Sequence, residues 1–317
     1  MNSSTNELHI IFGTGPVGIW TMRTLVGMGR RVRMVNRSGS ADVPAGVEVV
    51  KADAYDAASA RAVVQGASVV YQCAQPHYYE WTEKFPPLQA SILEAAASVG
   101  ASLVICDNLY MYGDPQGKPI TEDMPYTAHT RKGRVRQQMA EAALAAHQAG
   151  RLRVAIGRAS DFFGPYDMVQ GEQLYIPAIE GKTVNMVGRM DMPHSFTYVP
   201  DFGRALAILG THEESWGQAW IAPTAPPVTQ KELVQMVGSV LGRPISARVG
   251  GRFILSVMGL FNKSAGEMVE MLYEFEKPFI VDGTRFERTF GIKPTPTMDA
   301  VRETVAWFKT YLARTQA

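Results

Sequence analysis

The feature that most constrains the fold of this chain is a glycine-rich turn near its N-terminus. Gly13-Thr14-Gly15-Pro16-Val17-Gly18 directly follows an apolar run, Leu8–Phe12, and opens a stretch with apolar residues at helical spacing. In a strand–turn–helix unit, the first glycine permits a tight turn and the second lets the backbone approach a pyrophosphate. The third lets the helix pack closely on the strand, and the amides at the helix start favour an anion. The turn therefore predicts a dinucleotide-binding site; the alternative is a generic glycine-rich connection.

The same alternation of strand and helix continues through the first two-thirds of the chain. Its apolar runs are nearly continuous, which is typical of parallel strands covered on both faces. The predicted strands are Leu8–Phe12, Val32–Asn36, Val47–Asp53, Ser68–Cys73, Leu103–Asp107 and Val154–Ala159. The predicted helices are Val17–Met28, Ala57–Gln65, Leu88–Val99 and Lys132–Ala149. This order predicts an α/β fold with a doubly wound, Rossmann-type parallel sheet.

The pattern changes after about residue 165, where the loops lengthen. Ser195–Val199 and Ala219–Ala222 still have the character of strands, and Met298–Leu312 predicts a final amphipathic helix. Thr229 and Glu232 have the spacing of a capping box at the start of another helix. We therefore expect a smaller C-terminal substrate lobe that is interleaved with the sheet domain. The predicted dinucleotide-binding domain covers 1–165 and 195–223, and the predicted substrate-binding lobe covers mainly 166–194 and 224–317.

Composition excludes several classes of protein. The 317 residues include 31 Lys and Arg against 30 Asp and Glu, so no basic field for nucleic acid is present. Two cysteines, Cys73 and Cys106, cannot form a disulfide framework and favour a reducing compartment. No stretch approaches the ~20 apolar residues of a membrane span, the N-terminus has no signal-peptide pattern, and no His/Cys cluster has metal-ligand spacing. We expect a soluble cytoplasmic protein without a metal, nucleic-acid or membrane partner.

The end of the second predicted strand bears on the choice of cofactor. A site that prefers NAD usually carries an Asp or Glu there to bind the ribose 2′-hydroxyl. This chain has Asn36-Arg37-Ser38 instead, with no acid. An arginine can form paired hydrogen bonds to a 2′-phosphate, and Asn36 and Ser38 can add donors. The sequence therefore favours NADP(H) over NAD(H), unless Arg37 is a solvated loop residue and either cofactor binds.

Two further strand ends supply candidate cofactor contacts. Asp53 and Ala54 follow the third strand, where Asp53 either meets the adenine edge or makes a loop hydrogen bond. Asp56 is expected to cap the next helix. Cys73-Ala74-Gln75 follows the fourth strand, at the carboxyl edge where ligands bind in open α/β sheets. Cys73 has no neighbouring motif that would activate a thiol, so packing is its expected role.

Several motifs together resemble one family. They are Gly13–Gly18, Asp53, Tyr110-Met111-Tyr112-Gly113, Thr121–Pro125, Gly157–Pro165 and Phe196–Asp201. In these motifs the chain resembles the extended short-chain dehydrogenase/reductases, the group named for NAD-dependent epimerases and dehydratases. The resemblance covers nearly the whole chain. It implies a nicotinamide cofactor, and it implies a homodimer that pairs through the helices predicted at Leu88–Val99 and Lys132–Ala149.

The catalytic pattern of that family is altered here. Members usually have Ser or Thr after the fifth strand and Tyr-x-x-x-Lys on the next helix. In this chain the Ser position holds Asn108, and our register places Lys132 at the Tyr position and Arg136 at the Lys position. Lys132 and Arg136 are four residues apart and should share one helix face. The chain therefore resembles an atypical member, to which the tyrosine mechanism cannot be transferred.

Other groups must then carry the chemistry. Lys132 could protonate a substrate oxygen or stabilise an oxyanion, and Asn108 offers a neutral donor. Tyr110 and Tyr112 offer phenols, although Tyr112 could equally be a core residue. Arg136 could hold a ribose or pyrophosphate, unless it and its basic neighbours only form a charged surface turn. Ala159 and Ser160, in the Gly157–Pro165 motif, complete the candidate cofactor contacts.

The substrate side is less well marked. His77, in the aromatic segment Gln75–Trp81, could carry a proton but is more simply a surface or packing residue. Asp161 and His194 are similar candidates on connecting segments. A Ser160–His194–Asp201 hydrolase has no Gly-x-Ser-x-Gly motif to support it. The apolar run Phe253–Phe261 is expected to form a core helix, or else to line a pocket for an apolar substrate.

Three functions are compatible with these residues. The first is an NADP(H)-dependent oxidoreductase for a small, apolar carbonyl or enone compound. The second is a nucleotide-sugar epimerase or dehydratase, in which the hydride leaves and returns. The third is a redox sensor that binds NADP(H) without turnover, which the altered Tyr-x-x-x-Lys pattern makes a serious alternative.

The cofactor preference can be tested by titration. Replacing Arg37 with Ala removes the guanidinium expected to pair with the 2′-phosphate. NADP(H) affinity should then fall by about tenfold or more, while NAD(H) affinity stays the same. Calorimetric titration of wild type and R37A with both cofactors measures this. Unchanged NADP(H) affinity in R37A would remove the assignment.

Overall fold

The computed structural model describes residues 7–259, 261 and 263–315. The chain divides into two compact units, each assembled from separate segments. Unit 1 consists of Met1–Met111, Arg131–Arg158 and Phe202–Ala222, and unit 2 consists of Tyr112–Thr130, Ala159–Asp201 and Pro223–Ala317. The functional division into a dinucleotide-binding domain and a substrate-binding lobe stays a prediction.

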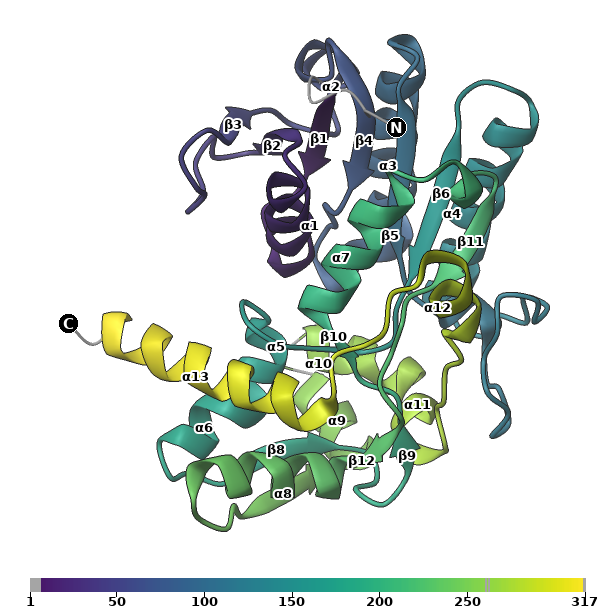
Figure 1. The fold of residues 1–317 in the computed structure, drawn as a ribbon. Coiled ribbons are helices and arrows are strands. Elements are labelled where there is room, and N and C mark those ends of the chain that lie inside the picture. Colours follow the sequence, from purple (N-terminus) through teal and green to yellow (C-terminus); the bar gives the residue numbers. More distant parts are fainter. Residues whose placement is uncertain (1–6, 260, 262, 316–317) are drawn as a thin grey trace. The chain divides into compact units, whose positions relative to one another are not determined.

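Unit 1 is built on a parallel sheet of seven strands, which confirms the predicted fold class (Figure 1). The strands are β1 (Leu8–Phe12), β2 (Arg31–Asn36), β3 (Glu48–Lys51), β4 (Ala67–Gln72), β5 (Ser102–Asp107), β6 (Val154–Arg158) and β11 (Gln218–Ile221). Their order is β11-β6-β5-β4-β1-β2-β3. The chain builds outward from β1 in one direction and then from β4 in the other. The carboxyl ends of β1 and β4 therefore form the switch point at which such sheets bind ligands.

Helices cover both faces of this sheet. The helices of unit 1 are α1 (Pro16–Gly27), α2 (Ala57–Val63), α3 (Trp81–Ser98), α4 (Arg131–Gln148) and most of α7 (Val199–Leu209). Apolar residues of α2, α3 and α4 join those of the strands in one core on one face. On the other face α7 lies against β6. A Cβ on Gly157 would come within 2.4 Å of the Leu206 side chain, which shows how closely the helix approaches the strand.

Two boundaries in the sequence analysis were wrong. Helix α3 begins at Trp81 instead of the predicted Leu88, and it contains Pro86 and Pro87. The rings of Trp81 and Phe85 are buried in the core, with centroids 5.2 Å apart, and this packing holds the first turns in place. The predicted strand Ser195–Val199 is reduced to β10 (Thr197–Tyr198), because Val199 already begins α7.

Unit 2 contains short paired strands and several helices. β8 (Val184–Val187) pairs in parallel with β13 (Ala247–Gly250), and β7 (Phe162–Phe163) with β10. β9 (Pro193–His194) pairs antiparallel with β12 (Val228–Thr229). The helices are α5 (Met168–Gln170), α6 (Ile176–Ile179), α8 (Gln230–Leu241), α9 (Arg252–Gly259), α10 (Lys263–Met268), α11 (Tyr273–Glu276), α12 (Thr284–Phe290) and α13 (Thr297–Thr315), with a π turn at Gly171–Tyr175. The core of this unit lies between α8 and α13.

The capping box predicted from Thr229 and Glu232 is confirmed. The Thr229 hydroxyl accepts a hydrogen bond from the Glu232 amide, while the Glu232 carboxylate accepts one from the Thr229 amide. Two amides at the start of α8 are thereby satisfied. The helix ends before Gly242, which adopts the left-handed conformation that glycine takes without strain.

The apolar run Phe253–Phe261 is not a core helix, contrary to expectation. In α9 the side chain of Leu255 is buried but Phe253 is 80% exposed, and Phe261, beyond the end of α9, is 90% exposed. Leu260, in the same run, lies outside the described residues. Among the residues that the structure describes, no helix is both long enough and apolar enough to span a bilayer.

Close contact between α1 and α7 can be tested with two glycine substitutions. A Cβ on Gly203 in α7 would lie 2.5 Å from the Cβ of Trp20, whereas a Cβ on Gly27 at the end of α1 would meet nothing within 4 Å. Gly203→Ala should lower the free energy of unfolding by about 1–3 kcal/mol because the two helices must separate. Gly27→Ala should leave it unchanged or raise it by up to about 1 kcal/mol. Urea unfolding measures both, and equal effects would contradict the packing.

Candidate dinucleotide-binding site

The three glycines of the first turn have different environments. Gly13 has a φ of +106°, and a Cβ there would lie 2.7 Å from the amide nitrogen of Ala74. A Cβ on Gly18 would lie 2.1 Å from the carbonyl oxygen of Gly13. A Cβ on Gly15 would meet no protein atom within 4 Å. Packing therefore explains Gly13 and Gly18, while Gly15 leaves open space where a ligand can approach the backbone.

The start of α1 provides donors beside that open space. Gly15 is the N-cap, without a side-chain cap, and Pro16 occupies the first helical turn. Proline is tolerated there because the first amides of a helix have no intrahelical partner. The helix dipole and the free amides of this turn favour an anion. The residues present thus fit the diphosphate of a dinucleotide.

The loop after β2 is held together by Asn36. Its side-chain amide donates to Thr14 Oγ1 at 3.0 Å and to the Ser40 carbonyl at 2.8 Å, and its Oδ1 accepts from the Ser38 hydroxyl at 3.1 Å. Asn36 therefore joins the β2 end to the glycine turn. Arg37 is exposed and makes no hydrogen bond or ion pair with any described residue. Its guanidinium remains accessible to a ligand.

The ends of β3 and β4 are occupied partly by local hydrogen bonds. Asp53 Oδ1 accepts from the Tyr55 amide at 3.0 Å, which is the loop hydrogen bond considered for it, and a contact with adenine stays a prediction. Asp56 caps α2 through the Ala58 amide, as expected. Burial raises the pKa of the Cys73 thiol well above its ordinary value, which disfavours a nucleophilic thiolate. Ala54 is buried and Gln75 is exposed.

A buried ion cluster at the ends of β5 and β6 was missed by the sequence analysis. Asp107 Oδ1 accepts hydrogen bonds from Nε of Arg136, at 2.8 Å, and from its Nη2. Asp107 Oδ2 accepts from Nε of Arg158 at 3.1 Å. All three residues are 5% exposed or less. Nη1 of Arg136 is buried without a hydrogen-bond partner, so this nitrogen could still donate to a cofactor.

Only two of the four basic residues in the first turns of α4 lie at the surface. Arg131 and Arg134 are exposed, but Lys132 and Arg136 are buried, so the surface alternative was wrong for those two residues. Lys132 Nζ lies 4.5 Å from the centre of the Tyr78 ring, and Arg136 Cζ lies 4.4 Å from that of Phe85. Aromatic faces attract cations at these distances. The two side chains share one helix face, as their spacing predicted.

Within unit 1, Lys132 and Tyr110 both contact Tyr78, and Asn108 contacts Tyr110. The Tyr78 ring contacts Lys132, and the Tyr78 hydroxyl lies 3.4 Å from that of Tyr110. Asn108 Oδ1 accepts from the Tyr110 amide at 3.2 Å. Tyr112 belongs to unit 2, where it is fully buried and edge-on to Tyr126.

The remaining candidates lie on unit 2 or at the surface. Ala159 and Ser160 follow β6 and are buried, with the Ser160 amide donating to Thr197 Oγ1 at 3.2 Å. His194 and Asp161 are in direct contact, at 2.9 Å. His77 is exposed and stacks on Tyr79.

The arrangement of unit 2 also excludes the Ser160–His194–Asp201 triad. The Asp201 carboxylate accepts from the amide and the hydroxyl of Thr295, at 2.6 and 2.9 Å. The imidazole of His194 is bonded to Asp161 and to the carbonyl of Glu274. His194 therefore has no ring nitrogen left for Asp201.

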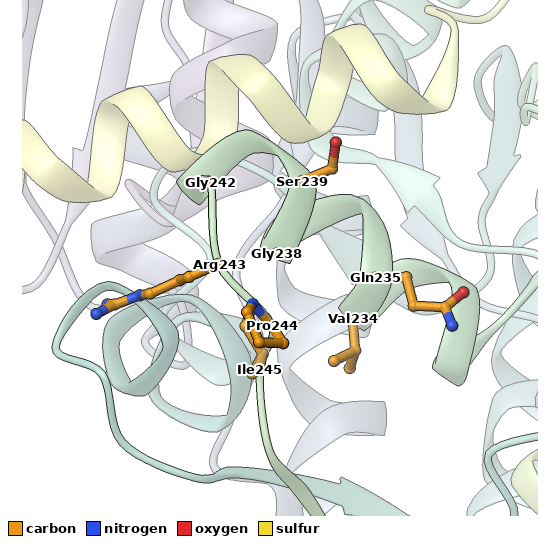
Figure 2. A pocket seen from close by; sticks show the side chains of 8 residues that line it. All are labelled: Val234, Gln235, Gly238, Ser239, Gly242, Arg243, Pro244 and Ile245. Atoms are coloured by element: carbon orange, nitrogen blue, oxygen red, sulfur yellow. The ribbon is translucent and has the colours of Figure 1, made fainter.

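A pocket of about 460 Å³ lies beside the C-terminal half of α8, lined by residues between Val234 and Ile245 (Figure 2). None of the candidate site residues lines it. Arg243, at its rim, already donates to the carbonyls of Ala178 and Ile179. The pocket has no group that suggests a ligand.

Comparison with known proteins identifies the family. Residues 10–220 match the model of the NAD dependent epimerase/dehydratase family. The chain belongs to this family. The resemblance drawn from the sequence motifs, to the extended short-chain dehydrogenase/reductases, is thereby confirmed.

Individual relatives are distant. An uncharacterized protein, y4nL, from Sinorhizobium fredii is 22% identical over 92% of this chain and 86% of its own length. The epimerase Mth375 of Methanothermobacter thermautotrophicus has a similar structure, with a TM-score of 0.80 and 16% identity over 98% of this chain and 94% of that one. DesIV, a dTDP-glucose 4,6-dehydratase of Streptomyces venezuelae solved with NAD bound, gives a TM-score of 0.78 and 20% identity over 97% and 98%. At these identities the solved structures establish the fold alone.

The ion cluster yields a stability prediction. Asp107→Asn keeps the side-chain shape but removes the carboxylate charge to which the buried Arg136 and Arg158 are bonded. The free energy of unfolding should fall by about 3–5 kcal/mol, measured by urea denaturation. Glu213→Gln, which breaks an exposed pair with Arg153, is the matched control and should cost about 1 kcal/mol or less. Similar small losses in both variants would show that Asp107 does not hold the cluster.

Proposed function

We propose that this chain is an enzyme that binds a nicotinamide dinucleotide at the glycine turn of unit 1. The observation that carries the proposal is the open space at Gly15, beside the free amides of α1 and at the switch point between β1 and β4. The family supports the same ligand class, and the structural neighbour DesIV was solved with NAD. When bound, the cofactor supplies or accepts a hydride.

We infer NADP(H) as the preferred cofactor. No acid follows β2, and the guanidinium of Arg37 is exposed and makes no hydrogen bond or ion pair in the described part of the chain. Asn36 fixes this loop against Thr14 and so places Arg37 at the end of the strand. A planar guanidinium suits the paired hydrogen bonds that a phosphate accepts.

The reaction proposed is reduction of a small carbonyl or conjugated enone. Lys132 replaces the usual tyrosine in our register, and its ammonium lies on the ring of Tyr78, whose hydroxyl is 3.4 Å from that of Tyr110. A buried cation stabilises the negative charge that develops on a substrate oxygen as hydride adds to carbon. Arg136 is fixed by Asp107 and keeps Nη1 as a donor for a ribose or phosphate oxygen.

A second candidate is a nucleotide-sugar epimerase or dehydratase. Its support is the printed activity of neighbours such as DesIV. That chemistry begins with oxidation of an alcohol, which needs a base to take the hydroxyl proton. The Lys132 position offers a buried ammonium instead of the family's tyrosine, and a cation suits the negative oxygen that forms in reduction better than the proton abstraction that begins oxidation.

The proposal is tested by following NADPH absorbance against enones, aldehydes and ketones. We expect saturable oxidation of NADPH with at least one of these classes. Lys132→Met should lower kcat by about 100-fold or more with NADPH affinity within a few-fold, because the cation acts on the transition state. Arg134→Met, an exposed residue on the same helix, is the control and should retain activity.

The same experiment separates the alternatives. Tight NADPH binding without turnover of any compound would favour a redox sensor. Conversion of a sugar nucleotide without net consumption of the cofactor would favour an epimerase or dehydratase. Full activity of Lys132→Met would remove Lys132 from the reaction.

A further inference from the structure

Unit 2 exposes a concentrated apolar surface that the proposed function does not use. In the described part of the chain ten large hydrophobic side chains are exposed, and six of these lie within residues 249–261. Exposed apolar side chains that occur singly are ordinary, whereas a contiguous group marks a surface that binds something. We call the six residues the α9 patch; they are Val249, Phe253, Ile254, Val257, Met258 and Phe261.

The orientation of α9 turns most of this patch outward. Phe253 and Val257 are four residues apart, as are Ile254 and Met258, so these four side chains share one side of the helix. Leu255, which points to another side, is buried. A surface helix normally turns its apolar side toward the core. In α9 the larger apolar side is the exposed one, so the core of unit 2 does not account for it.

Helix α10 holds α9 in this orientation. A Cβ on Gly259 would lie 2.6 Å from the Cα of Gly266, so the two helices cross with their backbones almost in contact. Phe261 lies between the two helices in sequence and is the most exposed of the large hydrophobic side chains that the structure describes. Its ring therefore protrudes from the surface of the unit.

Positive charge accompanies the α9 patch. Residues 244–266 contain three cationic side chains and no Asp or Glu. Arg248 lies in β13, Arg252 begins α9 and Lys263 begins α10, and all three are exposed. Cations therefore precede and follow the apolar residues, and this segment contains no acid that would balance them.

Acids of other segments balance this charge only in part. Arg252 lies 3.2 Å from Glu276 of α11, and the two side chains are 57% and 35% exposed. Exposed pairs of this kind contribute little, so Arg252 can exchange Glu276 for another anion. Arg248 donates to the neutral Oδ1 of Asn185 and forms no ion pair with any residue that the structure describes. Glu267, the next acid along the chain, is half-buried in α10.

These properties favour a lipid surface over a protein partner. A protein partner needs a complementary surface for each protruding side chain. The interface of a bilayer accepts the rings of Phe253 and Phe261 without such a pocket, and arginine and lysine can bind lipid phosphates beside them. A second copy of this chain would bring the same cations against one another, and like charges across an interface are unfavourable.

We propose that the α9 patch is a peripheral membrane-binding surface, which inserts its apolar side chains into the interface of an anionic bilayer and binds lipid phosphates through Arg248, Arg252 and Lys263. Apolar insertion and attraction to anionic lipid add to one another in such binding. The expectation of no membrane partner rested on the lack of a spanning segment, which binding at the surface does not require. The inference concerns unit 2 alone and is independent of the proposed function.

Sedimentation of the full chain with lipid vesicles tests this surface. The probes are vesicles of phosphatidylcholine alone and vesicles of phosphatidylcholine and phosphatidylglycerol in equal parts. We expect saturable binding to the anionic vesicles that weakens as salt is raised, and binding to the neutral vesicles that is weaker by about tenfold or more. No binding to the anionic vesicles, or equal binding to both kinds, would overturn the proposal.

Two double variants separate the apolar and charged contributions. Phe253→Ser with Phe261→Ser should lower the affinity for anionic vesicles by about tenfold or more, because two rings no longer enter the bilayer. Arg248→Gln with Arg252→Gln should lower it by about tenfold or more and reduce its salt dependence. All four side chains are exposed, so thermal unfolding should match the wild type. Unchanged affinity in either double variant would overturn the proposal.

Unit 2 offers a matched control for each kind of substitution. Val169 is an apolar residue of α5 that is 67% exposed, and Val169→Ser controls for loss of an exposed apolar side chain. Arg302 of α13 is exposed and pairs with Asp299, so Arg302→Gln controls for loss of an exposed, paired cation. Both variants should bind anionic vesicles as the wild type does. A loss in either as large as in the double variants would show that the α9 patch is not the binding surface.

A second copy of the chain is the competing occupant of the α9 patch. Sedimentation velocity without vesicles distinguishes it from lipid. We expect the wild type and Phe253→Ser with Phe261→Ser to have the same sedimentation coefficient at all concentrations. A wild-type assembly that this double variant dissociates would assign the patch to contact between copies and overturn the proposal.

Discussion

The structure of unit 1 depends on the close approach of backbone at the first turn. The Gly13 carbonyl leaves no room for a side chain on Gly18, and the Cys73–Ala74 backbone leaves none on Gly13. This contact holds the start of α1 against the ends of β1 and β4, and it is why the turn needs glycine at both positions. Gly15 is not constrained in this way, so packing does not explain its lack of a side chain, and the ligand approach that we propose there does.

Buried charges fix the side chains at the carboxyl ends of β5 and β6, on the same edge of the sheet as the glycine turn. Asp107 lies between two guanidiniums, and removing these groups from water is costly unless their hydrogen bonds are well formed. The cluster fixes Arg136, the residue that our register assigns to the lysine position of the family. In unit 2, packing also fixes a buried polar contact, since a stacked aromatic ring holds His194 against Asp161. In both places packing determines which polar atoms remain available to a ligand.

Local patterns predicted much of the fold. The continuous apolar runs located the strands of the main sheet to within two residues, and the caps at Asp56 and Thr229 follow from short-range chemistry. Predictions failed where contacts between residues far apart in the sequence decide whether a segment is helical or buried. Buried Trp81 and Phe85 sustain a helix through two prolines, and the apolar face of α9 is exposed although its composition suggested a core.

The residues of the candidate site likewise fall into two groups, those that local sequence signals predict and those that long-range contacts bring together. The glycine turn and the acid-free end of β2 are local signals, and they could be interpreted from the sequence. The role of Asp107 could not, because its partners lie 29 and 51 residues away. Asp161 and His194 were candidates separately, but their contact spans 33 residues and no spacing rule connects them.

Gly15→Ala tests the central claim, that the glycine turn binds the diphosphate of a nicotinamide dinucleotide, most directly. The substitution meets no protein atom and the backbone there is extended, so thermal stability should be unchanged. Its methyl group would occupy the space needed by the diphosphate, so NADPH affinity should fall by about tenfold or more in a fluorescence titration. Equal affinities in wild type and Gly15→Ala, or no saturable binding of NADPH or NADH to the wild type, would contradict the claim.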